Sequence, residues 1–193
     1  TVLNEELNLD PLKEYGVTMT PNGKIYRKDY QGFLPALMAK MYDDRVLYKK
    51  KMFEAKLANQ KNPSRELQID ISRYHNLHLV KYLQLTSAYA PLDNNYYSWL
   101  DNENAEAITM AGQLSIRWIE KKLNVWLNKI LETKGRDYVV AIDTDSVYVS
   151  FDKMIELTQP KDPVEFLDKI AKQQVEAFID KSYQELADYT NAY

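Results

Sequence analysis

The chain has 193 residues and contains no cysteine. Disulfide bonds, thiolate metal sites and cysteine nucleophiles are therefore excluded. Glycine occurs only five times, and together with abundant Lys, Leu, Ala and Glu this favours helices. No apolar run approaches the roughly 20 residues that cross a bilayer, and no basic and then apolar segment opens the chain. We therefore expect a cytosolic protein with no membrane partner.

The residues that are present have the composition of a soluble globular protein, 45% hydrophobic and 27% charged. The formal net charge is −3, whereas a free-standing nucleic-acid-binding protein usually has a basic face. The charges are uneven, because bases outnumber acids between Lys40 and Arg73 and acids gather in the C-terminal half. His75 and His78 are three residues apart on a predicted helix, but without a third ligand nearby we assign them no metal.

Residues 33 to 60 repeat apolar side chains at the helical period, which predicts an amphipathic helix. Its apolar stripe consists of Leu34, Leu37, Met38, Met41, Tyr48 and Met52. Arg45 falls within this stripe and Lys49 lies at its edge. A guanidinium there can extend to a solvated edge or pair with an acid, or it can mark a face that meets an anion.

A second helix is predicted from Ser64, a favourable N-cap, toward Tyr89. Its stripe consists of Ile69, Tyr74, Leu77, Val80, Lys81 and Leu85. Two long helices joined by a short polar turn must lie antiparallel. The sequence therefore predicts a projecting helical hairpin.

The stretch from Tyr138 to Phe151 has two β-branched runs around the polar residues Asp143-Thr144-Asp145-Ser146. This pattern predicts a β-hairpin with buried or half-buried arms and a four-residue acidic connection. Carboxylates at i and i+2 of a reversing backbone can approach one Mg²⁺ ion. Asp and Ser are also ordinary turn residues that need no metal, so the turn alone leaves both interpretations open.

The remaining segments complete an α+β arrangement, with helices packed on a small antiparallel sheet. Asn22-Gly23 predicts a short hairpin over residues 17 to 26. A long core helix is expected to begin at Asn102 or Asn104 and reach about Lys134, with Gly135 as its stop. Its predicted apolar stripe consists of Ala105, Ile108, Gly112, Ile116, Ile119, Leu123, Trp126, Leu127 and Ile130. Residues 152 to 162 are expected to be a polar connection, and a last helix is expected from Pro163 to about residue 192.

The run Ile142-Asp143-Thr144-Asp145-Ser146-Val147-Tyr148-Val149 resembles the C motif of family B DNA polymerases. Its flanks resemble the replicative polymerases of large tailed bacteriophages. The resemblance implies that the hairpin lies in the palm domain and that Asp145, with Asp143, holds the two catalytic metal ions, Mg²⁺. It also implies that Arg45 and Lys49, on the first helix of the fingers domain, hold the incoming triphosphate.

The end of the second helix, Tyr82 to Ala90, corresponds to the B motif of that family, a Lys followed after three residues by Asn-Ser-x-Tyr-Gly. Ser87 and Tyr89 match this motif, and the resemblance places Tyr89 beneath the incoming base. Tyr82 stands where the motif has Lys, and a phenol cannot neutralise phosphate charge. Lys81 is one position away, about 100° around the helix, and would need a shifted register to replace it.

Further departures are Thr86 for Asn and Ala90 for Gly, with Ser98 and Glu103 near positions where related phage enzymes have arginines. These departures favour the hypothesis that the sequence has been reworked or no longer has the catalytic role. The family also uses a metal-binding aspartate from an Asp-x-x-Ser-Leu-Tyr-Pro motif, which this sequence lacks. The nearest acidic and aromatic stretch, Asp10 to Tyr15, has neither its order nor its β pattern.

The resemblance thus predicts a fragment of a phage DNA polymerase that does not polymerise alone. We expect a palm-proximal segment over residues 1–32, a fingers hairpin over 33–92 and a partial palm over 93–193. The parent enzyme would act on primer-template DNA and deoxynucleoside triphosphates in an infected bacterium. Two alternatives remain, a split polymerase completed by a partner chain and a catalytically silent scaffold. Apolar surface left by missing domains also predicts self-association.

Overall fold

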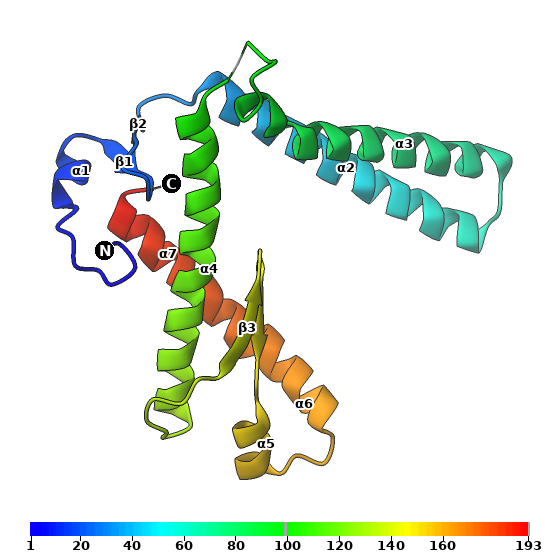
Figure 1. Cartoon of the computed structure of the whole chain (residues 1–193). Helices are drawn as coiled ribbons and strands as arrows, with labels where there is room; N and C mark the ends of the chain where they lie inside the picture. The colour runs from blue at the N-terminus through cyan, green and yellow to red at the C-terminus, as the bar shows by residue number, and fades with distance from the viewer. Residues whose placement is uncertain (99, 193) are drawn as a thin grey trace. The chain divides into compact units, whose positions relative to one another are not determined.

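The computed structural model describes residues 1–98 and 100–192. It consists of helices and two separate antiparallel strand pairs, which confirms the α+β class (Figure 1). In chain order the elements are α1 (Asp10–Glu14), β1 (Val17–Met19), β2 (Ile25–Arg27), α2 (Phe33–Lys61), α3 (Arg65–Ser87), the 3-10 turn Ala90–Leu92, α4 (Asn102–Ile130), β3 (Val139–Asp143), β4 (Ser146–Val149), α5 (Asp152–Thr158), α6 (Pro163–Ile170), the π-helical turn Ala171–Val175 and α7 (Glu176–Thr190). No helix in the described part of the chain is both long and apolar enough to cross a bilayer.

The contacts divide the chain into two compact units. The first contains Thr1–Lys28 and Glu106–Tyr193, and the second contains Asp29–Ala105. The sequence predicts three segments, residues 1–32, 33–92 and 93–193, and that division stays a prediction.

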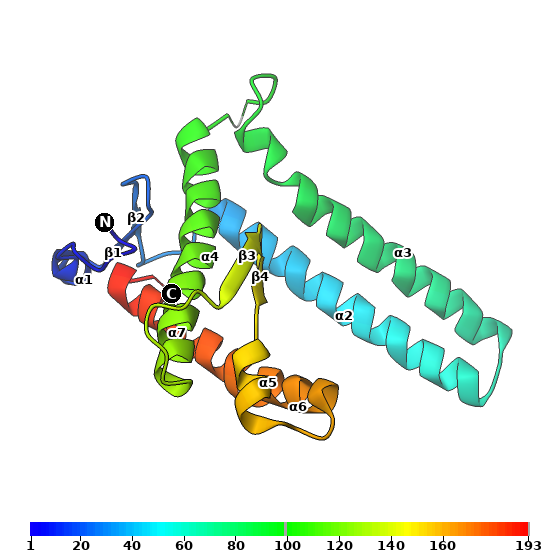
Figure 2. The ribbon, with the colours of Figure 1, turned by 60° about the horizontal axis from the view of Figure 1, so that its bottom comes forward.

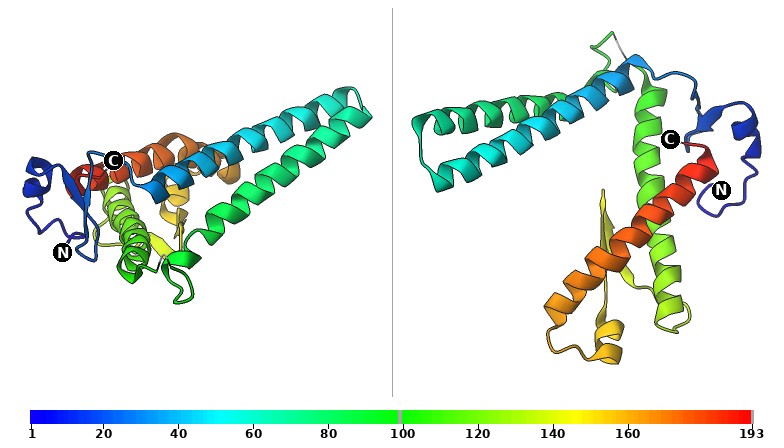
Figure 3. Two further views of the ribbon diagram at one scale, coloured as in Figure 1. Left: turned by 90° about the horizontal axis from the view of Figure 1, so that it is seen from above. Right: turned by 180° about the vertical axis from the view of Figure 1, so that it is seen from behind.

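The first unit is built around the crossing of α4 and α7, seen from both sides in Figures 1 and 3. Its buried cluster contains Trp118, Ile119 and Leu123 of α4 together with Val139 of β3 and Leu186 of α7. The Trp118 indole N–H donates to the Ser182 carbonyl at 2.8 Å. One hydrogen bond and a continuous apolar contact therefore fix the two helices, although the sequence stripe had not included Trp118.

A second buried cluster lies where α4 ends, and it contains Leu127, Leu131, Tyr138 and Met154. Met154 belongs to α5, so the predicted polar connection over residues 152 to 162 is wrong for its first half. The sequence pattern did not indicate this helix because it has no buried apolar stripe: within α5, Met154 is the one buried residue. Asp162 then accepts hydrogen bonds from the amides of Val164 and Glu165 and caps α6, which confirms the predicted helix start.

Helix α4 ends at Ile130 and not near Lys134. The chain turns at Glu132, which has a φ of 52°, while Gly135 has a φ of 64° in the connection that follows. The expected glycine stop was therefore misplaced: a non-glycine residue takes the left-handed conformation just after the last helical turn. Ile108 and Ile130 were expected in the buried stripe of this helix, but their side chains are exposed.

The N-terminal segment packs on the end of α7, as the adjacent blue and red segments in Figure 1 show. The Asn191 amide donates to the carbonyls of Val17 and Leu12, and the Thr18 hydroxyl donates to the carbonyl of Thr190. β1 and β2 form the predicted hairpin, with Met19 opposite Ile25. Gly23 in its turn has a φ of 84°, a conformation that favours glycine.

The second unit contains the predicted helical hairpin, in which α2 and α3 run side by side and antiparallel in every view (Figures 1, 2 and 3). Ser64 caps α3 as expected, because its side chain accepts a hydrogen bond from the Leu67 amide at 3.2 Å. The stripe predicted for α2 faces inward, and Met52 is buried. In α3 the prediction was wrong for Ile69 and Val80, which are 58% and 51% exposed.

Candidate functional site

Strands β3 and β4 form a hairpin (Figure 2). Its acidic tip is a two-residue turn. Asp143 pairs with Ser146, so only Thr144 and Asp145 connect the strands, and the four-residue connection predicted from the sequence is wrong. Thr144 has a φ of 50°, in the left-handed region found in tight hairpin turns. Consequently Asp143 ends one strand, Asp145 belongs to the turn, and both are exposed.

Local hydrogen bonds hold this turn. The Thr144 hydroxyl donates to Asp143 Oδ1 at 3.1 Å, and the Ser146 hydroxyl donates to the Asp143 carbonyl at 3.1 Å. The arms are less buried than predicted, because Val140 is 68% exposed at an irregularity in the pairing between Val139 and Ala141. Val147 and Val149 pack against the α4–α7 cluster and fix the base of the hairpin.

Asp143 and Asp145 can contribute oxygen ligands to one hard cation at this tip. Mg²⁺ is bound by one or two carboxylates and keeps several waters or substrate oxygens, and the two exposed side chains fit that description. Among the described residues, no group of three His, Cys, Asp or Glu side chains is arranged to hold a metal ion. A site for two ions therefore needs ligands beyond this hairpin.

Arg45 lies in the interface of the helical hairpin, half-buried, as its place in the predicted stripe implied. Its guanidinium carbon is 5.1 Å from the centre of the Tyr82 ring. Within the described residues, neither Arg45 Nε nor His78 Nδ1 has a hydrogen-bond partner, although both atoms are buried. Lys49, one turn further along α2, is exposed.

Lys81 is engaged with Asp44 of α2, its Nζ lying 3.1 Å from a carboxylate oxygen. Lys40 approaches the same carboxylate at 3.7 Å. The hydrogen bond from Lys81 and the charge of Lys40 hold the pKa of Asp44 below its ordinary value, and partial burial opposes them. The ammonium that could have replaced the missing B-motif lysine thus already has an anionic partner.

Ser87 and Tyr89 lie at and just beyond the end of α3. The Ser87 hydroxyl donates to the Leu83 carbonyl at 2.7 Å, so it faces back along its own helix. Tyr89 is half-buried and precedes the 3-10 turn Ala90–Leu92. These two residues belong to the second unit with Arg45, Lys49 and Lys81, whereas Asp143 and Asp145 belong to the first.

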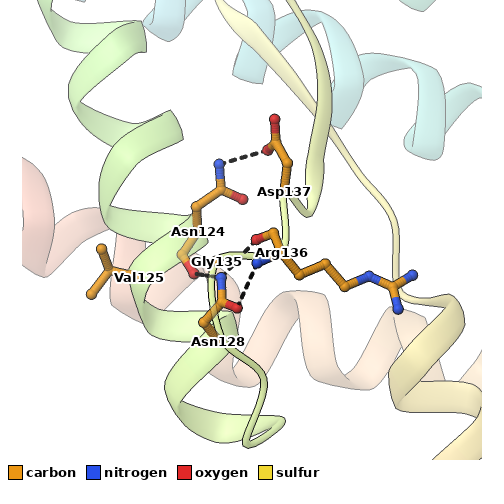
Figure 4. Close-up of a pocket in the computed structure, with 6 residues that line it drawn as sticks. All are labelled: Asn124, Val125, Asn128, Gly135, Arg136 and Asp137. Carbon is orange, nitrogen blue, oxygen red and sulfur yellow. Dashed lines mark hydrogen bonds between the residues drawn. The ribbon is translucent and has the colours of Figure 1, made fainter.

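Asn124 and Asn128 of α4 hold the segment that leads into β3, a role that no pattern in the sequence predicted (Figure 4). Asn124 Oδ1 accepts hydrogen bonds from the amides of Tyr138 and Val139, and its Nδ2 donates to Asp137 at 2.8 Å. Asn128 accepts from the Arg136 amide and donates to the Arg136 carbonyl. The shallow pocket between these residues is lined by groups that already bond one another, so it serves to position β3.

Comparison with known proteins gives no matching family model. The chain is 32% identical over 228 residues to the DNA-directed DNA polymerase of Enterobacteria phage T4, across 94% of this chain and 25% of that enzyme. It is 29% identical to the DNA-directed DNA polymerase of Escherichia phage RB69, across 89% of this chain and 24% of that enzyme. A DNA polymerase of Pyrococcus glycovorans is 27% identical across 76% of this chain and 16% of its own length.

These matches extend over both units of the structure, since they cover about nine-tenths of the chain in the two phage enzymes. The aligned stretch of 228 residues is longer than the 193 residues of this chain, so the T4 enzyme has residues there without a counterpart here. The chain spans about a quarter of the length of these phage relatives. The relationship predicted from the sequence is therefore confirmed, and the chain corresponds to a fragment of a phage family B DNA polymerase.

Proposed function

We propose that this chain provides the nucleotide-binding surface and part of the metal site of a DNA-directed DNA polymerase. The observation that supports this most strongly is the similarity to the T4 enzyme across 94% of the chain, which includes the exposed pair Asp143 and Asp145. The substrates proposed with this function are primer-template DNA and deoxynucleoside triphosphates. The proposed location is the cytoplasm of a phage-infected bacterium.

In this proposal Asp145 and Asp143 ligate Mg²⁺. When bound, the ions lower the pKa of the attacking primer hydroxyl and neutralise charge on the leaving pyrophosphate. The hairpin residues contribute by holding two carboxylates at an exposed turn whose base is fixed on the α4–α7 cluster. Their exposure keeps both groups accessible to a substrate phosphate and to further ligands.

Arg45 and Lys49 are proposed to contact the triphosphate, and Ser87 and Tyr89 to line the place of the incoming base. Arg45 is well suited to phosphate because its fixed fork of donors can bind two oxygens, and its buried Nε has no partner among the described residues. Lys81 is a further proposed contact with the triphosphate. A phosphate would have to compete with Asp44 for its ammonium.

We further propose that these residues alone do not polymerise DNA, because a site for two metal ions needs a carboxylate that the hairpin does not supply. The same incompleteness is compatible with a split polymerase, in which a partner chain provides that carboxylate. It is also compatible with a scaffold that has lost its substrate, and the replacement of the B-motif lysine by Tyr82 favours this second alternative.

Calorimetric titration of the chain with a deoxynucleoside triphosphate and Mg²⁺ or Mn²⁺ tests the proposal. Binding should weaken in Asp145→Ala and in Arg45→Ala. The matched controls Asp180→Ala and Arg117→Ala remove the same charges from exposed positions of α7 and α4 and should bind as the parent does. Absence of binding in the parent would reject the nucleotide site and favour the scaffold alternative.

A further inference from the structure

One side of the helical hairpin carries both aromatic rings and cations. On α2 these are Tyr42, Arg45, Lys49, Phe53 and Lys56, whose spacing of three or four residues places them along one helix face. Tyr42 is 55% and Phe53 is 49% exposed, and Lys49 and Lys56 are exposed. Water therefore meets two large rings on this face, and the Lys56 ammonium lies beside one of them, Phe53.

Helix α3 extends the same surface through His75 and Tyr82, which are seven residues apart and so share a face of their helix. The contact between Arg45 and the Tyr82 ring brings the two helix faces together. Tyr82 is 42% exposed although it covers the guanidinium. We call these seven residues, Tyr42, Arg45, Lys49, Phe53, Lys56, His75 and Tyr82, the basic-aromatic face.

Within α2, no acid lies three or four residues from Lys49 or Lys56, the two lysines of the basic-aromatic face. The carboxylates of the helical hairpin lie at other positions of α2 and α3, namely Asp43, Asp44, Glu54, Glu66 and Asp70. Asp44 already pairs with Lys81 and Lys40. An ordinary solvated helix face places acids three or four residues from its lysines. The separation of charges therefore leaves one side of the hairpin with positive charge only.

Stabilisation of the helices themselves accounts for part of this arrangement. Lys56 lies 5.7 Å from the Phe53 ring centre, and such a cation–π contact at an exposed site stabilises the helix modestly. Helix stability does not require the rings to stay half-exposed, nor the carboxylates to be absent. Both features suit the binding of a flexible polyanion with flat bases, because aromatic rings stack on bases and cations bind phosphates.

We propose that the basic-aromatic face binds single-stranded nucleic acid, with bases stacked on Phe53, Tyr42 and Tyr82 and with phosphates held by Lys49, Lys56 and Arg45. From Tyr42 to Lys56 the face extends about 21 Å along α2, at 1.5 Å per residue. It continues two turns beyond Lys49, past the residues proposed above for the triphosphate. The proposal is independent of the metal-binding hairpin and goes beyond the proposed nucleotide site.

The test is fluorescence anisotropy of labelled oligo(dT) of about ten nucleotides, titrated with the whole chain in a buffer that contains EDTA. Phe53→Ala combined with Lys56→Ala should weaken binding roughly five- to a hundredfold, as expected when a stacking ring is removed. The matched control combines Lys50→Ala with Leu57→Ala, which removes one cation and one apolar side chain from the outer face of the same helix. The control should bind as the parent does.

Three outcomes would overturn the proposal. These are no binding in the parent, equal loss in the control variant, and equal affinity for an abasic strand with the same number of phosphates. The last would show a general attraction for polyanions without base stacking. Because EDTA removes divalent ions, and because Phe53 and Lys56 are outside the proposed triphosphate contacts, oligonucleotide binding and triphosphate binding can fail separately.

Discussion

The guanidinium of Arg45 is covered by the ring of Tyr82, with 5.1 Å between the guanidinium carbon and the ring centre. In the B motif that this stretch resembles, the position of Tyr82 is occupied by lysine, so an aromatic cover replaces a second cation. Arg45 keeps its charge in this arrangement, but the phenol contributes none toward a phosphate. The departure from the motif thus changes the surface that an anion meets.

Tyr82→Lys is expected to raise the affinity for a deoxynucleoside triphosphate with Mg²⁺ by at least about tenfold. Hydrogen bonds to charged groups contribute about 1.5–3 kcal/mol, and the new ammonium would stand beside Arg45 and Lys49. Titration calorimetry measures the change. Leu83→Lys, which adds the same charge at a neighbouring position where the side chain is 55% exposed, should have little effect. An equal gain in both variants would contradict the prediction.

The Asp44–Lys81 pair predicts a pH dependence of stability. The Lys81 hydrogen bond, helped by the charge of Lys40, lowers the pKa of Asp44 in the folded chain below its ordinary value of 3.8. A lowered folded-state pKa means that the stabilisation is complete above the unfolded-state pKa and is lost as the pH falls through the folded-state pKa. The Asp44→Asn variant should therefore lose less stability than the parent as the pH falls from about 5 to about 2. Thermal unfolding of both proteins across this range measures the difference. Parallel curves for the two proteins would exclude this role of the pair.

Trp118 predicts the strongest core effect. Its side chain is 1% exposed and joins α4 to α7 through the 2.8 Å bond to Ser182. Trp118→Ala should lower the free energy of unfolding by about 3–5 kcal/mol, as large-to-small core substitutions do. Chemical denaturation followed by circular dichroism measures the loss. Val125→Ala on the same helix, where the side chain is 63% exposed, should change stability by less than about 0.5 kcal/mol.

Asn124→Ala should destabilise the base of the acidic hairpin by about 2–4 kcal/mol, because the amides of Tyr138 and Val139 lose their shared acceptor. Tyr138 is 0% and Val139 is 4% exposed, so water cannot easily replace that acceptor. Asn124→Asp keeps an acceptor oxygen and should lose less. Hydrogen exchange of these two amides distinguishes the predicted local loosening from general unfolding, and unchanged protection in Asn124→Ala would refute it.

The helical hairpin could be predicted from the sequence because its signals are local. The period of α2 and the Ser64 cap determine both helices and their antiparallel arrangement. The pairs that join them are not local: Arg45 meets Tyr82 and Asp44 meets Lys81 only after the helices have packed. Ile69 and Val80 were assigned inward because they are apolar, yet both are exposed, whereas Lys81 of the same predicted stripe is half-buried and pairs with Asp44.

For the acidic hairpin, the strands could be predicted from the sequence, but the turn at its tip and the support at its base could not. Its strands and its two carboxylates follow from alternating β-branched residues around polar ones, but the shorter turn depends on the left-handed backbone at Thr144, which threonine rarely adopts. Its support by Asn124 joins residues from a helix and a later strand. An asparagine on a helix surface gives no signal that two buried amides fourteen or fifteen residues away need it.

The π-helical turn Ala171–Val175 makes one helical rod out of α6 and α7 while giving each part a different partner. Before the turn, Phe166 and Ile170 pack on the cluster of Tyr138 and Met154. After it, Phe178 and Ile179 pack on the cluster of Trp118. A wider turn accommodates one extra residue, and each residue rotates a regular helix by about 100°. Deleting a single residue within 171–175 should therefore preserve the helix content but turn the apolar side of α7 away from α4. The length of this turn thus sets how the two cores are aligned.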